Sequence, residues 1–220
     1  LMGYVNEEKK KRTLASRGLT GDVLLKSMPS GPRVADVFVQ PSVRKKALDL
    51  EVEMSKGTPP GPWEFTARML DAAGKEEIAF QGEADVPSGD APKVQLSFPW
   101  ESPRLWSMGK PELYTLQLEA RPKGATEPSD SYAQRFGFRE FWIEGRDFHL
   151  NGEKIRLRPR GGHGTPVHAA EMKSFFDGSR AAGFNISQIW PEDALEPGQW
   201  NFWDLLADEA DSHGWALIGA

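Results

Sequence analysis

The sequence predicts a mostly β fold: an immunoglobulin-like antiparallel β-sandwich followed by a truncated (β/α) barrel start of about three βα units. Three observations predict it. Apolar and polar side chains alternate from residue 34 to 138 with the two-residue period of half-buried strands. Gly and Pro interrupt this alternation at short intervals, as turns do. After Phe138, strand-like and helix-like segments take turns, which is typical of a parallel sheet.

The first half contains about seven short stretches with strand character. In the clearest one, Leu48, Leu50 and Val52 alternate with acidic residues. The segment 57–62 contains two Gly and three Pro and separates this stretch from the next. Short strands of this kind, each apolar on one side, predict two antiparallel sheets packed face to face. The expected strands are residues 37–39, 48–54, 63–69, 78–80, 94–98, 114–118 and 132–138.

The second half begins with an expected hairpin over residues 141–158, because Asn151-Gly152 is a strong hairpin-turn signal. Alternating units follow it, and Gly183 and Gly214 are expected to end the two helices. A closed eight-stranded barrel takes roughly 250 residues, so about three of its strands fit here. An open three-stranded sheet would leave a buried-type strand at its edge, so we expect the fold to continue beyond residue 220. The expected units are strand 155–158, helix 169–182, strand 184–189, helix 202–214 and strand 215–218.

Composition excludes several classes of function. The 220 residues carry a net charge of −5, which argues against nucleic acid or an anionic membrane surface as a partner. The sequence lacks both an apolar run of the ~20 residues that a membrane span needs and a secretory signal. Cysteine is absent, which excludes disulfides and leaves bacterial cytoplasm and periplasm both open. The basic clusters 9–12 and 44–46 are expected to be solvated turns. The histidines show no metal-ligand spacing, so neither a metal nor a cofactor is expected.

Three segments resemble one family. Residues 18–23, GLTGDV, are similar to a G-I-x-G-x-V segment; residues 103–116 fit P-x-L-W-x(4)-P-x-L-Y-x-L; and residues 137–152 fit G-F-R-x(8)-F-x-L-N-G. In order and spacing these segments resemble glycoside hydrolase family 2, which contains β-galactosidases, β-glucuronidases and β-mannosidases. The resemblance covers the chain from Gly18 onward.

The resemblance implies a domain organisation and a reaction. Residues 1–33 would be the tail of an N-terminal jelly-roll domain and a linker, residues 34–137 the sandwich, and residues 138–220 the incomplete first part of the catalytic barrel. The implied activity of the parent protein is retaining exo-β-glycoside hydrolysis, with carbohydrate as its partner. Such family members carry their acid/base Glu in an Asn-Glu pair after the fourth barrel strand and their nucleophile near the seventh. We therefore assign no catalytic residue, and we expect the fragment to be inactive alone.

Two residues are candidates for substrate binding. His163 lies in a segment, residues 158–163, that resembles the family's R-G-x-N-x-H, and the resemblance implies that it hydrogen-bonds sugar hydroxyls. The segment departs from the family at Pro159 and Gly161. Trp190 follows an expected strand end and could stack on a sugar ring. Simple packing is the alternative for both side chains. Gln188 stands where the family often has Arg.

Two alternatives stay open. The chain could be a non-catalytic carbohydrate- or protein-binding β-sandwich module, or a degenerate family member in which the altered segment 159–164 and Gln188 reflect a changed site. The sequence does not name the sugar or linkage. Exposed barrel-type strands also predict possible self-association of the fragment.

Overall fold

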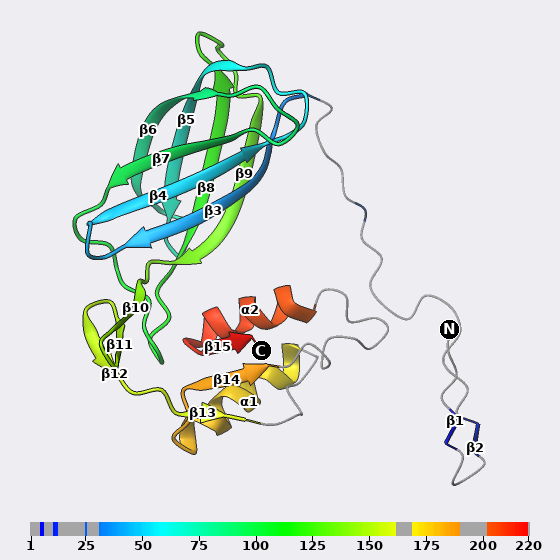
Figure 1. The fold of residues 1–220 in the computed structure, drawn as a ribbon, viewed down its shortest axis with the longest axis vertical. Helices are drawn as coiled ribbons and strands as arrows, with labels where there is room; N and C mark the ends of the chain where they lie inside the picture. Colours follow the sequence, from blue (N-terminus) through cyan, green and yellow to red (C-terminus); the bar gives the residue numbers. More distant parts are fainter. Residues whose placement is uncertain are drawn as a thin grey trace.

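The structure is a computed structural model, and it describes residues 5–6, 11–12, 25, 31–161, 169–189 and 202–219. A seven-stranded β-sandwich occupies one end of the molecule, and a small antiparallel sheet and an α/β unit lie next to each other beyond it (Figure 1). A short antiparallel pair, β1 (Val5–Asn6) and β2 (Lys11–Arg12), lies in the N-terminal part. Of the two helices that the structure describes, neither has the length and apolar character needed to cross a bilayer.

The sandwich consists of two antiparallel sheets, as the alternation predicted. One sheet has the order β3-β4-β7 and the other the order β6-β5-β8-β9. All seven expected strands are present, and the strand predicted at residues 78–80 is much longer than expected. The strands are β3 (Val34–Ser42), β4 (Ala47–Met54), β5 (Gly61–Leu70), β6 (Glu76–Val86), β7 (Lys93–Pro99), β8 (Leu113–Pro122) and β9 (Asp130–Gly137).

The inward-facing side chains of the two sheets form one continuous core. Leu50 of β4 and Leu116 of β8 are fully buried, whereas their acidic and polar neighbours in sequence lie toward solvent. Trp100 packs at one end of this core, with its ring centroid 4.9 Å from that of Tyr114 and 5.3 Å from that of Phe138. Burial of this apolar surface, at roughly 25 cal/mol per Å², is the main stabilising contribution to the sandwich.

The small sheet contains β10 (Phe141–Glu144), β11 (Asp147–Leu150) and β12 (Glu153–Ile155) in that order. Asn151 and Gly152 form the turn between β11 and β12, both with positive φ, as an Asn-Gly hairpin turn requires. The prediction of one hairpin was incomplete, because a second turn at Gly145 adds β10 to the sheet.

The α/β unit contains β13 (Pro159–Arg160), α1 (Ala169–Ala181), β14 (Ile186–Ile189), α2 (Phe202–His213) and β15 (Ala216–Gly219). Its three strands are parallel, in the order β13-β14-β15. Both helices end where the sequence predicted, at residues with positive φ, Gly183 and Gly214. The first parallel strand is shifted from the predicted 155–158 to 159–160, because Ile155 instead pairs with Phe148 in the antiparallel sheet.

Trp106 is buried at 2% exposure, but it is not part of the sandwich core. It lies between the sandwich and the α/β unit, where its Nε1 donates a hydrogen bond to the carbonyl oxygen of Asp211 in α2. The basic cluster 44–46 is the solvated turn that the sequence predicted. Each of its cations has an acidic partner: Arg44 pairs with Glu140, Lys45 with Asp49 and Lys46 with Glu101.

Candidate functional site

The parallel sheet packs against the helices and also borders a cavity. Leu217 of β15 packs with the helix core formed by residues such as Phe176 and Leu206, and it reaches the cavity as well. Its neighbours Ala216 and Ile218, together with Ile186 of β14, line the cavity. Because strand side chains alternate between faces, Gln188 is on the same face as Ile186. Gln188 is paired in register with Ile218, toward the carboxyl ends of the strands.

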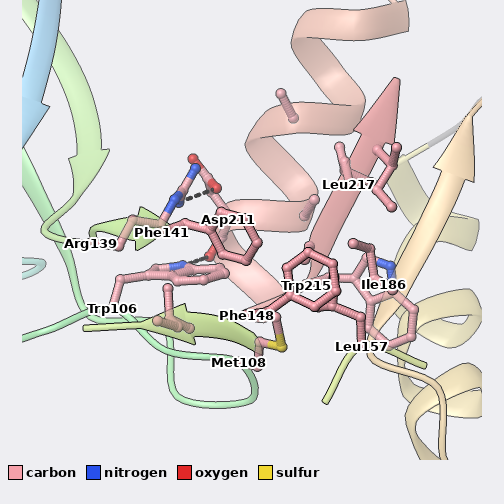
Figure 2. A pocket seen from close by; sticks show the side chains of 15 residues that line it. Trp106, Met108, Arg139, Phe141, Phe148, Leu157, Ile186, Asp211, Trp215 and Leu217 are labelled. Carbon is pink, nitrogen blue, oxygen red and sulfur yellow. Dashed lines mark hydrogen bonds and ion pairs between the residues drawn. The ribbon is translucent and has the colours of Figure 1, made fainter. Parts of the chain in front are cut away.

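The cavity has a volume of about 420 Å³ and lies between this sheet and the apolar face of the β10–β11 hairpin (Figure 2). The rings of Phe141 and Phe148 stack on the hairpin side, with centroids 5.8 Å apart. Trp215 is on the sheet side, and its Nε1 donates to Oγ of Ser187 at 2.9 Å. The lining is mostly apolar and includes Trp106, Met108, Leu150, Leu157, Ala207, Ala210 and Leu217.

Among the lining residues that the structure describes, charged side chains are found at one place. Arg139 and Asp211 form an ion pair there, with 2.7 Å between Nη1 and Oδ1. Retaining glycoside hydrolysis needs two carboxyl groups about 5 Å apart. The described residues of the lining contribute a single carboxylate, and Arg139 already pairs with it. This described part of the lining is therefore suited to apolar packing.

The hairpin that forms one wall of the cavity is fixed to the sandwich by Glu140. This carboxylate accepts hydrogen bonds from the backbone N–H and Nε of Arg44, at 2.9 and 2.7 Å. Partial burial raises the pKa of Glu140, but the hydrogen bonds from Arg44 outweigh it and leave the pKa below its usual value. The Arg44 guanidinium also lies 4.6 Å from the ring centroid of Trp142, which stacks on His149. Nδ1 of His149 is buried without a hydrogen-bond partner.

The carboxyl edge of a parallel sheet is where barrel enzymes carry their catalytic groups. At the opposite, amino ends of the strands, the amide of Asn185 connects the first two strands: its Oδ1 accepts from the N–H of Arg158 and its Nδ2 donates to the carbonyl of Arg156. The guanidinium of Arg160 lies 4.0 Å from the ring centroid of Phe175 in α1, on the helix side of the sheet. None of the residues in β13, β14 or β15 is acidic.

Both predicted substrate-binding residues lie outside the described residues. His163 follows the end of β13 by three positions, and Trp190 follows β14 directly. Their roles stay predictions. Over the described residues, no group of three His, Asp or Glu side chains is arranged to hold a metal ion.

Sequence reasoning missed the group formed by Trp106, Arg139 and Asp211. The guanidinium of Arg139 lies 4.5 Å from the ring centroid of Trp106, and both side chains bond Asp211. A signal was present, because Trp106 and Arg139 belong to two of the recurring motifs. Their common partner is 105 residues from Trp106 along the chain, so only the structure brings the three residues together.

The described residues form a β-sandwich that is joined through a small sheet to a three-stranded parallel α/β unit. The model of the family "Glycosyl hydrolases family 2" matches residues 33–139, which are the sandwich and the first residues after it. The resemblance of the motifs in this chain to that family is thereby confirmed.

Two relatives found by sequence comparison have the names of glycosidases. A putative β-glucuronidase from Formosa agariphila is 28% identical over 156 residues, which are 69% of this chain and 18% of the relative. A β-galactosidase from Thermoanaerobacterium thermosulfurigenes is 32% identical over 118 residues, which are 52% of this chain and 16% of the relative. The chain therefore spans less than a fifth of the length of these two relatives.

Solved structures share the fold. A glycosyl hydrolase family 2 member from Bacteroides cellulosilyticus superposes with a TM-score of 0.66 at 17% identity, covering 85% of this chain and 24% of that one. The β-glucuronidase of Bifidobacterium dentium, solved with coumarin-3-O-glucuronide, has a TM-score of 0.60 at 19% identity, covering 87% of this chain and 31% of that one.

Proposed function

We propose that this chain is part of a retaining exo-β-glycosidase that hydrolyses O-glycosidic bonds in carbohydrates. The family match over residues 33–139 carries this proposal. The names of the relatives, a β-glucuronidase and a β-galactosidase, support it. In this proposal residues 1–33 end a jelly-roll domain, residues 34–137 are an immunoglobulin-like sandwich, and residues 138–220 open the catalytic barrel.

The catalytic carboxylates belong, in this proposal, to parts of the protein outside this chain. Retaining hydrolysis uses one carboxyl group as acid and base and a second as nucleophile. The parallel strands described here contain no acidic residue, and among the described residues that line the cavity the only carboxylate is the paired Asp211. The chain also spans only a small share of its relatives. We therefore expect the 220-residue chain to be inactive by itself.

The residues at the carboxyl edge would bind the sugar rather than cleave it. His163 would hydrogen-bond a sugar hydroxyl, and Trp190 would stack against the apolar face of the ring. Gln188 is on the cavity-side face of β14, near the same edge. Its neutral amide can donate and accept hydrogen bonds but carries no charge, so we expect it to contact hydroxyl groups rather than a carboxylate of the substrate.

A glycosidase assay tests this proposal. The 220-residue chain and the longer product of its parent gene are each incubated with the 4-nitrophenyl β-glycosides of glucuronate, galactose and mannose. The proposal predicts that the longer product releases nitrophenol from at least one substrate and that the 220-residue chain releases none. Release by the short chain, or none by a folded longer product, would overturn the proposal.

A further inference from the structure

The C-terminal end of α2 is bonded to several groups of the sandwich side of the molecule, and Arg180 of α1 also donates to the carbonyl of His213. The last carbonyls of a helix have no partners within the helix and need donors from elsewhere. Here the indole Nε1 of Trp106 donates to the carbonyl of Asp211 at 2.8 Å. The N–H of Gly109 donates to the carbonyl of Gly214 at 2.9 Å. Trp106 and Gly109 both belong to the connection between β7 and β8 of the sandwich.

Positive charges surround the same helix end. Arg135 of β9 donates to the carbonyl of Asp208 at 2.8 Å and pairs with its carboxylate at 3.1 Å. Arg139 pairs with the carboxylate of Asp211. Cations near a helix C-terminus are favourable because the helix dipole is negative there. The sandwich and the segment that leaves it therefore supply both hydrogen bonds and charge to α2.

The groups that cap the helix are themselves held in place. The N–H of Trp106 donates to the carbonyl of Phe138 at 3.0 Å, and its carbonyl accepts from Nδ2 of Asn151 at 2.8 Å. A Cβ atom at Gly137 would lie 2.8 Å from the side chain of Trp106, so the indole is packed directly on β9. The cap is thus a fixed surface of the sandwich.

The sandwich and the α/β unit approach each other closely at Gly214. This residue has a φ of 60°, and a Cβ atom there would lie 2.6 Å from the backbone nitrogen of Gly109. Gly214 is followed at once by Trp215 and β15. The contact therefore fixes both the end of α2 and the point from which β15 starts.

We propose that the sandwich is the folding template of the α/β unit: α2 and β15 stay ordered only while the sandwich caps the end of α2. An isolated helix of 12 residues is marginal in water. Among the described residues, the separate core of the α/β unit contains few fully buried side chains, whereas the sandwich core is several times larger. This inference concerns the folding of the chain and does not depend on the proposed glycosidase activity.

Two glycine variants test directly whether the sandwich keeps α2 and β15 ordered. Gly214→Ala and Gly183→Ala both place a side chain at a helix end with positive φ, but only the first meets the sandwich, because a Cβ at Gly183 has nothing within 4 Å. Hydrogen exchange of the folded 220-residue chain is the measurement. We expect Gly214→Ala to accelerate amide exchange in α2 and β15 about tenfold more than Gly183→Ala does, equivalent to about 1.4 kcal/mol. Protection of the sandwich strands should stay unchanged.

A second pair of variants keeps the inference testable if Gly214→Ala does not fold. Trp106→Phe removes the indole N–H that caps α2, and Trp63→Phe removes one that bonds Pro59 inside the sandwich. The template predicts that Trp106→Phe accelerates exchange mainly in α2 and β15, and that Trp63→Phe acts first on the sandwich strands. Equal acceleration by the two glycine variants, or equal loss of protection in sandwich and α2 with Trp106→Phe, would overturn the inference.

Discussion

Gly137 is a position where one added methyl group should destabilise the protein. In the substitution Gly137→Ala, the new Cβ would lie 2.8 Å from Cβ and Cγ of Trp106. Carbon atoms pack best at about 3.5–4.0 Å, so the indole would have to move by roughly 0.7 Å. The backbone N–H of Trp106 is hydrogen-bonded to Phe138 and its carbonyl to Asn151, so this residue cannot move freely.

The magnitude follows from two opposing contributions. Alanine at an unstrained position stabilises by about 0.4–1 kcal/mol through the unfolded state, whereas overpacking of a rigid site costs about 1–3 kcal/mol. The net expectation is a loss of about 1–2 kcal/mol, and a fall in Tm of roughly 2–8 °C for a chain of this size.

Urea unfolding followed by tryptophan fluorescence and far-UV circular dichroism measures this loss. The matched control is Gly89→Ala, because a Cβ at Gly89 has nothing within 4 Å and its φ is ordinary. The control should lie within about 0.5 kcal/mol of the unsubstituted chain. If Gly137→Ala is as stable as Gly89→Ala, the tight contact between Trp106 and β9 does not exist in solution and the reasoning fails.

Three further predictions follow from single residues. Gly178→Ala, at an exposed position inside α1 with open space around it, should stabilise that helix by up to about 1 kcal/mol in thermal unfolding; a destabilised variant would contradict the helix assignment. Leu116→Ala, in the fully buried centre of the sandwich, should cost about 2–5 kcal/mol in urea unfolding, and a loss below about 1 kcal/mol would contradict that placement. The pKa of Glu140 is depressed in the folded state below its unfolded value of about 4.3, so its stabilisation is complete above that pH and is lost as the pH falls through the folded-state pKa. Glu140→Gln should therefore lose less stability than the unsubstituted chain when urea unfolding is compared at pH 7 and pH 3, and equal losses would argue against the bonds from Arg44.

Local patterns predicted the elements well because their causes are local. Alternation with period two in residues such as Leu48 and Leu50 follows from one-sided burial of a strand. The Asn151-Gly152 turn and the helix ends at Gly183 and Gly214 follow from backbone conformations that glycine and asparagine adopt easily.

Contacts between distant segments were not predictable from such patterns. The strand expected at 155–158 was placed wrongly, because Ile155 pairs with a strand that precedes it, and pairing choice depends on the assembled fold. The contact of Trp106 with Asp211 also depends on how two parts of the chain pack. For the site, the motifs led to His163 and Trp190, and both lie outside the described residues.

The most direct test of the central claim is covalent trapping. A retaining glycosidase forms a glycosyl-enzyme intermediate, which a 2-deoxy-2-fluoro glycoside with a good leaving group can trap and intact-mass measurement can detect. The account predicts that the longer product of the parent gene gains the mass of one fluorosugar, whereas the 220-residue chain gains none. A labelled 220-residue chain, or a longer product that hydrolyses glycosides with inversion and is never labelled, would contradict it.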